Sequence, residues 1–125
     1  MSIFITLNQG INGYVTDINT GLPLDNIIID YWNERGFILG STVTSFNGGF
    51  SLPIVFGDYY LSTDTNNAYT NEIYNDINCA NAAILGSCDV TQGEIISLPQ
   101  NNLLPIFVDI KLHTTADQIF TNSFE

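Results

Sequence analysis

Nucleophilic catalysis needs a serine, threonine or cysteine beside a base, and that base is most often histidine. The sequence holds one histidine, His113, at the end of the last predicted strand. It contains no Gly-x-Ser-x-Gly elbow, no phosphate-binding loop and no His-Glu-x-x-His pattern. The sequence motifs of serine hydrolases, nucleotide-binding enzymes and zinc peptidases are therefore absent.

A pair of carboxylates is the remaining catalytic route, as in glycosidases. Glu72, Asp76, Asp58 and Asp64 are available for such a pair. Acids scattered through Asn-rich loops more often form solvated turns than active sites. We therefore predict that the chain is not an enzyme and keep a glycosidase-like activity as a distant alternative.

Two oxygen-bearing side chains, Asp17 and Asn19, stand two positions apart before Gly21, which is the opening spacing of many calcium loops. The acid that such loops add at their far end is missing. The same residues also form ordinary turns. We predict no cofactor, with Ca²⁺ at Asp17 and Asn19 as the alternative.

Four aromatic residues, Tyr31, Trp32, Tyr69 and Tyr74, are the candidates for ligand binding. Exposed coplanar rings would form a platform for sugars, whereas buried rings would belong to the core. The sequence leaves both interpretations open.

The two cysteines, Cys79 and Cys88, enclose eight residues in a long segment, 66–93, that shows no sustained alternation. A disulfide here would stabilise the fold by about 2–3 kcal/mol in the chain-entropy model. The competing interpretation is half of a zinc site, which would need further Cys or His nearby. An even cysteine count in a β-rich acidic chain favours the disulfide and an oxidising compartment.

Alternating apolar and polar residues, rich in Ile, Thr, Tyr and Phe, predict strands rather than helices. A continuous run, Ile27-Ile28-Ile29, is typical of a central strand. Asn47-Gly48-Gly49 lies between two alternating runs and predicts a hairpin turn. The predicted strands are 11–17, 27–32, 37–45, 49–53, 59–65, 94–98 and 106–112, with a further strand at 3–7.

These patterns resemble the carboxypeptidase regulatory-like domains, which are transthyretin-like or Ig-like β-sandwiches of secreted bacterial proteins. The resemblance rests on Gly13-Tyr14-Val15-Thr16-Asp17, on the Asn47-Gly48-Gly49-Phe50 turn and on Gly57-Asp58-Tyr59. It continues through Tyr69-Thr70-Asn71-Glu72-Ile73-Tyr74 to Cys79, and through Cys88-Asp89-Val90-Thr91-Gln92-Gly93. The resemblance implies that Phe50 and Tyr59 are core residues.

Thirteen acids face two cations, so the net charge is −11. Such a surface repels phosphate backbones and anionic lipid, which argues against nucleic-acid partners. No run approaches the ~20 apolar residues of a membrane helix, so we predict no membrane insertion. The first residues lack a basic leader, and we expect any export signal upstream.

Together these features predict an all-β protein, a seven- to eight-stranded antiparallel Ig-like or prealbumin-like sandwich with a disulfide-stapled loop. We expect one module: 1–10 as the end of a preceding module or an extra edge strand, 11–112 as the sandwich, and 113–125 as a tail. Its expected function is a non-catalytic spacer, adhesion or protein-contact module of a larger exported bacterial protein. Carbohydrate binding is the alternative. The expected partners are proteins or polysaccharides at the cell surface and neighbouring modules of the parent chain.

Overall fold

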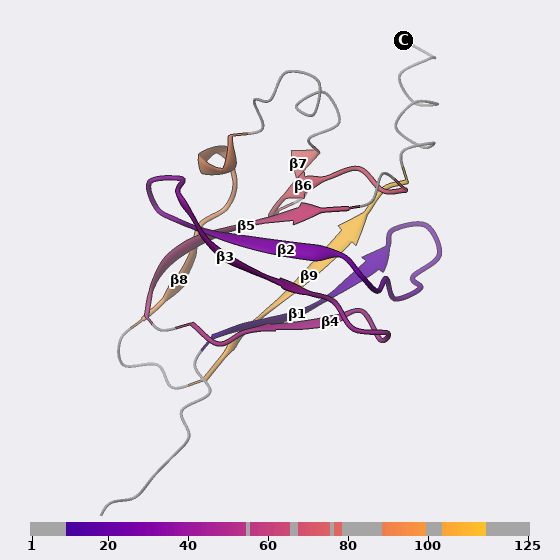
Figure 1. The fold of residues 1–125 in the computed structure, drawn as a ribbon, viewed down its shortest axis with the longest axis horizontal. Coiled ribbons are helices and arrows are strands. Elements are labelled where there is room, and N and C mark those ends of the chain that lie inside the picture. Colours follow the sequence, from indigo (N-terminus) through magenta and orange to yellow (C-terminus); the bar gives the residue numbers. More distant parts are fainter. Residues whose placement is uncertain are drawn as a thin grey trace, which may run out of the picture.

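The chain folds into two packed β-sheets. The computed structural model describes residues 10–54, 56–65, 68–75, 77–78, 89–99 and 104–114. Figure 1 shows β1, β4 and β9 as one layer and the remaining strands as the other. The strands are β1 (Ile11–Asp17), β2 (Ile28–Asn33), β3 (Ile38–Val43), β4 (Gly49–Leu52), β5 (Gly57–Asp64), β6 (Glu72–Ile73), β7 (Ile77–Asn78), β8 (Ile96–Leu98) and β9 (Ile106–Leu112), with a 3₁₀ turn, η1 (Val90–Gln92).

The smaller sheet has the order β4-β1-β9, and the larger has the order β3-β2-β5-β6-β7 with β8 also paired to β5. The prediction of an all-β sandwich is therefore confirmed. Nine strands are found among the described residues, where seven or eight were predicted. The two additional short strands, β6 and β7, lie in a segment whose composition favoured a loop.

One pair of strands, β1 and β9, runs parallel over seven residues, from Ile11 opposite Ile106 to Asp17 opposite Leu112. The prediction of a wholly antiparallel sandwich is wrong at this pair. Antiparallel neighbours follow naturally from short turns, whereas β1 and β9 are separated by the entire larger sheet. Local sequence patterns carry no information about their relative direction.

The Asn47-Gly48-Gly49 turn exists, but it does not join two strands of a hairpin. Its backbone closes with hydrogen bonds from Gly48 N to Ser45 O (2.8 Å) and from Ser45 N to Gly49 O (2.9 Å). The strand before it, β3, belongs to the larger sheet, and the strand after it, β4, pairs with β1 in the smaller sheet. The turn therefore carries the chain from one sheet to the other, and the hairpin prediction is wrong.

The core lies between the two sheets and follows the two-residue period of the strands. The side chains of β1 alternate in burial. Ile11 and Val15 are buried, whereas Asn12 is partly exposed and Tyr14 is exposed. Phe50 and Tyr59 lie in this core, 6% and 8% exposed. Gly57, with φ +147°, begins β5 two residues before Tyr59, whose hydroxyl oxygen lies 3.2 Å from where a Cβ of Gly57 would stand.

A second, smaller cluster lies on the other face of the larger sheet. Ile73 and Val90 are buried there, with Trp32 and Tyr60 packed against them. The turn η1 supplies Val90, and Asp89 caps this turn by accepting a hydrogen bond from Thr91 N (3.0 Å). Part of the segment predicted as a structureless loop therefore covers the sheet.

Three predictions lie outside the described residues: the strand at 3–7, the Cys79–Cys88 disulfide and the tail beyond Thr114. The two residues after β9 still pair with the segment before β6. Thr70 N donates to His113 O (2.9 Å), and Tyr69 forms an antiparallel bridge with Thr114.

Candidate functional site

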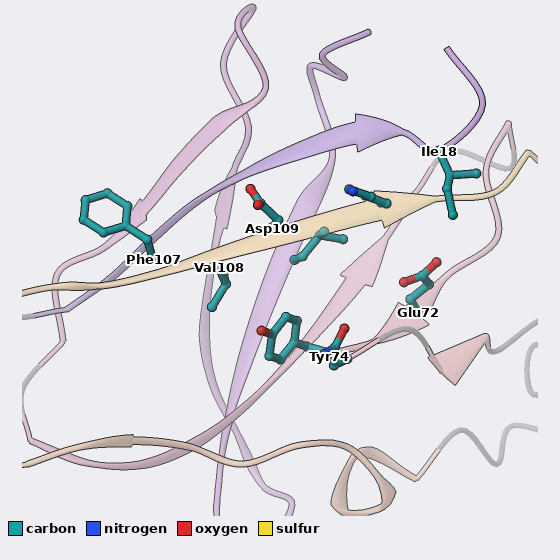
Figure 2. Close-up of a pocket in the computed structure, with 9 residues that line it drawn as sticks. Ile18, Glu72, Tyr74, Phe107, Val108 and Asp109 are labelled. Carbon is teal, nitrogen blue, oxygen red and sulfur yellow. The ribbon is translucent and has the colours of Figure 1, made fainter. Parts of the chain in front are cut away.

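A cleft of ≈ 430 Å³ opens between β9 and the β6 region of the larger sheet. Figure 2 shows Val108 and Asp109 on opposite sides of β9, with Tyr74 and Glu72 beyond the strand on the neighbouring segment. Alternation along β9 explains this arrangement, because successive side chains point to opposite faces. The cleft is lined by Ile18, Glu72, Tyr74, Asn75, Phe107, Val108, Asp109, Ile110 and Lys111.

Glu72 is the deepest charged residue of this cleft, at 3% exposed. Its backbone N–H donates to Thr63 Oγ1 (2.9 Å), which fixes the start of β6 against β5. Next to it, Tyr74 is held through the hydrogen bonds of its N–H to Leu61 O (2.9 Å) and of Glu94 N–H to its carbonyl (2.8 Å). A carboxyl group and a phenol are thus both held on ordered backbone.

Burial raises the pKa of the Tyr74 phenol, and the nearby carboxylates of Glu94 and Asp109 raise it further. The phenol therefore stays protonated at neutral pH and can donate or accept a hydrogen bond. Together with Glu72, it could hold a polar or cationic group. Among the residues the structure describes, no group of three or more His, Cys, Asp and Glu could hold a metal ion.

Among the described residues, the acids proposed as a catalytic pair make separate contacts. Asp58 accepts a hydrogen bond from Ser97 Oγ (2.7 Å) beside β8. Asp64 lies near Asp30 on β2, where burial and the Asp64 charge raise the pKa of Asp30. Glu72 lies in the cleft, and Asp76 is outside the described residues.

Asp17, the candidate calcium ligand, is almost fully buried and bound within its own turn. Its Oδ1 accepts hydrogen bonds from Asn19 N (2.8 Å) and Thr20 N (3.1 Å), and its Oδ2 accepts one from Tyr69 Oη (2.9 Å). These bonds, first that from Asn19 and then that from Tyr69, lower its pKa. In this structure Asn19 contributes its backbone to the Asp17 turn.

The four aromatic candidates do not share one surface. Tyr31 packs edge-on against Tyr59 in the main core, with ring centroids 6.2 Å apart. Trp32 packs in the second cluster and donates from Nε1 to Ser62 Oγ (2.9 Å). Tyr69 bonds Asp17, and Tyr74 packs against the core beside the cleft.

Two exposed surfaces were not found from the sequence. One is the β3 apolar edge, which we define as Phe37, Ile38, Leu39, Val43 and Phe46. The other carries Tyr14 and Phe107 on the smaller sheet. The three consecutive apolar residues 37–39 were a signal, but alternation alone does not show that a strand lies at the edge of its sheet.

No protein-family model matches this sequence, and no curated protein matches it. The structure resembles the Bacillus anthracis TIE protein, with a TM-score of 0.57 and 17% identity over 85% of this chain. It also resembles hydroxyquinol 1,2-dioxygenase from Pseudomonas putida DLL-E4 (TM-score 0.50, 11% identity, 85% of this chain). A weaker match is 5-hydroxyisourate hydrolase from Klebsiella pneumoniae (TM-score 0.42, 20% identity, 81% of this chain and 90% of that one).

At these identities the likeness concerns the fold alone. It supports the transthyretin-like β-sandwich of the predicted resemblance, and it leaves the carboxypeptidase regulatory-like and Ig-like assignments as predictions. The chain spans 17% of the TIE protein and 56% of the dioxygenase.

The prediction that the chain is not an enzyme needs correction. It relied on the absence of known catalytic motifs and on the scatter of the acids, yet the fold is shared with hydroxyquinol 1,2-dioxygenase, an enzyme. Sandwich architecture therefore gives no ground for excluding catalysis, because chemistry depends on the site and not on the fold.

No helix among the described residues is long and apolar enough to cross a membrane.

Proposed function

We propose that this chain is an interaction module of a larger exported protein, and that it binds an extended segment of a partner protein along the β3 apolar edge. The observation that carries the proposal is the composition of that edge. Residues 37–46 contain no charged residue and no proline. Ile38 and Val43 are 55% and 52% exposed, and Phe46 is 86% exposed.

An edge strand offers unpaired N–H and C=O groups to any chain that lies alongside it. Proteins usually blunt such edges with charges or proline, and β3 has neither. A partner strand would gain main-chain hydrogen bonds from β3 and cover its apolar side chains, which is the strand-addition mode of recognition. A register shift between Tyr31 and Trp32 interrupts the pairing of β2 with β3 near Ile38, so Gly40–Val43 is the regular part of this edge.

The charge of the chain favours a basic or neutral partner. Thirteen acids against two cations repel a second copy of the same chain as well as nucleic acid. A partner segment that alternates apolar with basic residues would cover the apolar side chains of the edge. Its basic residues would be attracted by the negative electrostatic potential of the chain.

The setting of the module is also part of the proposal. The TIE protein holds a similar fold in 17% of its length, which supports a module within a longer chain. The proposed Cys79–Cys88 disulfide and the acidic, β-rich composition support an extracellular or cell-surface location in an oxidising compartment.

The test is a selection from a displayed library of random extended peptides of about ten residues, followed by hydrogen exchange of the complex. Binders should be rich in basic and β-branched residues and should protect the amides of β3. Ile38→Lys and Val43→Lys should each abolish binding, whereas Leu104→Lys, at a side chain 71% exposed elsewhere, should not. The proposal is overturned if no binder emerges, or if binders protect another face and tolerate both edge substitutions.

A further inference from the structure

A shallow groove of ≈ 450 Å³ lies on the smaller sheet and shares Phe107 with the cleft beside Glu72. We call it the Tyr14 groove. It runs from the end of β3 across β4 and β1 to Phe107 on β9, three strands that lie together in Figure 1. The side chains that carry the argument are Asn12, Tyr14, Asn47, Ser51 and Phe107, with Gly49 between them.

The strand register places the two aromatic rings on one face. Asn12 pairs with Ser51 on β4 and with Phe107 on β9, and Tyr14 pairs with Gly49 on β4. Since side chains alternate along each strand, Asn12, Tyr14 and Phe107 share the face opposite the buried Val15 and Val108. Tyr14 is 50% exposed and Phe107 is 70% exposed, so neither ring is used by the core.

The Tyr14 ring lies next to Gly49. A Cβ built on Gly49 would stand 3.4 Å from Tyr14 Cε1, the distance of ordinary van der Waals contact. The edge of the Tyr14 ring therefore lies beside the backbone of Gly49, its partner on β4. Half of the Tyr14 side chain is exposed and is available to a ligand.

The polar side chains of the groove are held in place. Ser51 Oγ donates to Asn12 Oδ1 (2.8 Å). Asn47 Oδ1 accepts from Gly49 N (2.9 Å) and Ser45 Oγ (2.6 Å). With each carboxamide oxygen fixed in this way, the side-chain NH₂ groups of Asn12 and Asn47 are the donors left to serve a ligand.

No residue that lines the Tyr14 groove carries a charge, although the chain carries thirteen acids and two cations. A charged ligand would find no ion pair there, and an anion would be repelled by the surrounding field. The combination of exposed ring faces, amide donors and hydroxyl groups fits a neutral ligand that has one apolar face and many hydroxyls.

We infer that the Tyr14 groove is a binding site for neutral saccharides, in which a pyranose ring stacks on Tyr14 or Phe107 and its hydroxyls bond Asn12, Asn47 and Ser51. The residues differ from those predicted from the sequence, because Tyr31, Trp32, Tyr69 and Tyr74 are packed elsewhere. The groove meets the β3 apolar edge at Val43. The two proposals are therefore tested apart through Tyr14 and Phe107, which are not part of that edge, and through Ile38, which does not line the groove.

The experiment is a ¹H–¹⁵N NMR titration of the whole chain with cello-, xylo-, manno- and chito-oligosaccharides. Each sugar is used at about 20 mM, which detects dissociation constants in the millimolar range. At least one neutral sugar should shift the amides of Tyr14, Gly49, Ser51 and Phe107 in a saturable way. Polygalacturonate, a charged saccharide, should not.

Variants separate stacking from a general effect on the fold. Phe107→Ala should weaken binding about tenfold or more, and Tyr14→Phe should retain it while Tyr14→Ala loses it. Phe37→Ala, at a residue 64% exposed on the β3 apolar edge, is the matched control and should leave affinity unchanged. Unshifted amides in Ile29 and Leu61 would show that the core of each variant is intact.

The inference is overturned if no sugar shifts the groove, or if the shifts fall on Glu72 and Tyr74 instead. It is equally overturned if sugar binding survives both Phe107→Ala and Tyr14→Ala. Shifts of the groove by the selected β3 peptides, without any by sugars, would assign it to protein contact.

Discussion

Tyr69 Oη donates a hydrogen bond of 2.9 Å to Asp17 Oδ2, and this bond joins the segment after β5 to the end of β1. Sequence patterns alone predicted Asp17 as a possible calcium ligand and Tyr69 as a candidate aromatic residue for ligand binding. The same carboxylate also holds the turn that follows β1 through Asn19 N and Thr20 N. One nearly buried acid thus fixes two connections at this end of the sandwich.

Replacing the tyrosine by phenylalanine removes this bond and keeps the ring. We expect Tyr69→Phe to lower the free energy of unfolding by about 1.5 kcal/mol at pH 7, since the acceptor is charged. It should also raise the pKa of Asp17 towards its ordinary value, because the Tyr69 hydroxyl is the second-largest cause of the lowering. Urea unfolding and NMR titration of the carboxylate measure the two effects.

The contribution of Asp17 to folding stability depends on pH in a definite direction. The pKa of Asp17 is lower in the folded than in the unfolded state, so its contribution is complete above the ordinary value of 3.8 and is lost as pH falls through the folded pKa. The stability gap between the wild type and Tyr69→Phe should therefore narrow below about pH 4. A gap that stays constant down to pH 2 would show that the bond acts independently of the carboxylate charge.

Asp30 is expected to destabilise the fold. Its pKa is raised, first by burial and then by the Asp64 charge, so the folded state favours the protonated carboxyl. The favourable contribution of the protonated Asp30 carboxyl to folding stability is present below the ordinary pKa. It is lost as pH rises through the pKa of the folded state. Asp30→Asn should accordingly stabilise the chain at pH 7 by about 0.5 kcal/mol, as measured by urea unfolding.

The matched control is Asp64→Asn, which relieves the repulsion but leaves Asp30 partly buried. It should give a smaller gain, because burial is the larger cause of the shift. Both gains should fade below about pH 4, where the Asp30 carboxyl of the wild type is protonated in the folded state. A loss of stability in Asp30→Asn at pH 7 would contradict this account.

Two glycines with similar backbone angles separate the cost of a left-handed conformation from the cost of a clash. Gly21 has φ +74°, and a Cβ added there would meet no atom within 4 Å, whereas Gly48 has φ +77° and a Cβ there would stand 2.6 Å from Val15 O. Gly21→Ala should cost about 1 kcal/mol, and Gly48→Ala about 3 kcal/mol. Equal losses in thermal or urea unfolding would remove the clash from the explanation.

The proposed Cys79–Cys88 disulfide can be tested chemically. In protein purified without reductant, iodoacetamide should label neither cysteine, and after reduction and unfolding it should label both. Reduction should increase hydrogen exchange within 66–93 while the amides of β1, β2 and β5 stay protected, because the buried core residues of these three strands lie outside that segment. Global loss of protection on reduction would instead make the disulfide essential to the fold.

The sequence by itself determined where most strands lie and which of their side chains face inwards. The predicted bounds of β1 and β9 agree with the structure, and those of β2 to β5 agree within a few residues. Phe50 and Tyr59 are in the core as the resemblance implied. The reason is that a strand's two-residue period is a local property, which apolar alternation records directly.

Only the tertiary structure decided which strands pair and which surfaces stay exposed. Nothing near Asn47-Gly48-Gly49 shows that β3 and β4 enter different sheets, and nothing near Ile11 shows that it lies beside Ile106. The same long-range pairing puts β3 at an edge and brings Tyr14 and Phe107 onto one face. It also packs the four aromatic residues predicted as ligand-binding candidates at separate, partly buried places. Pairing depends on contacts between segments far apart in the chain, so a pattern of neighbouring residues cannot record it.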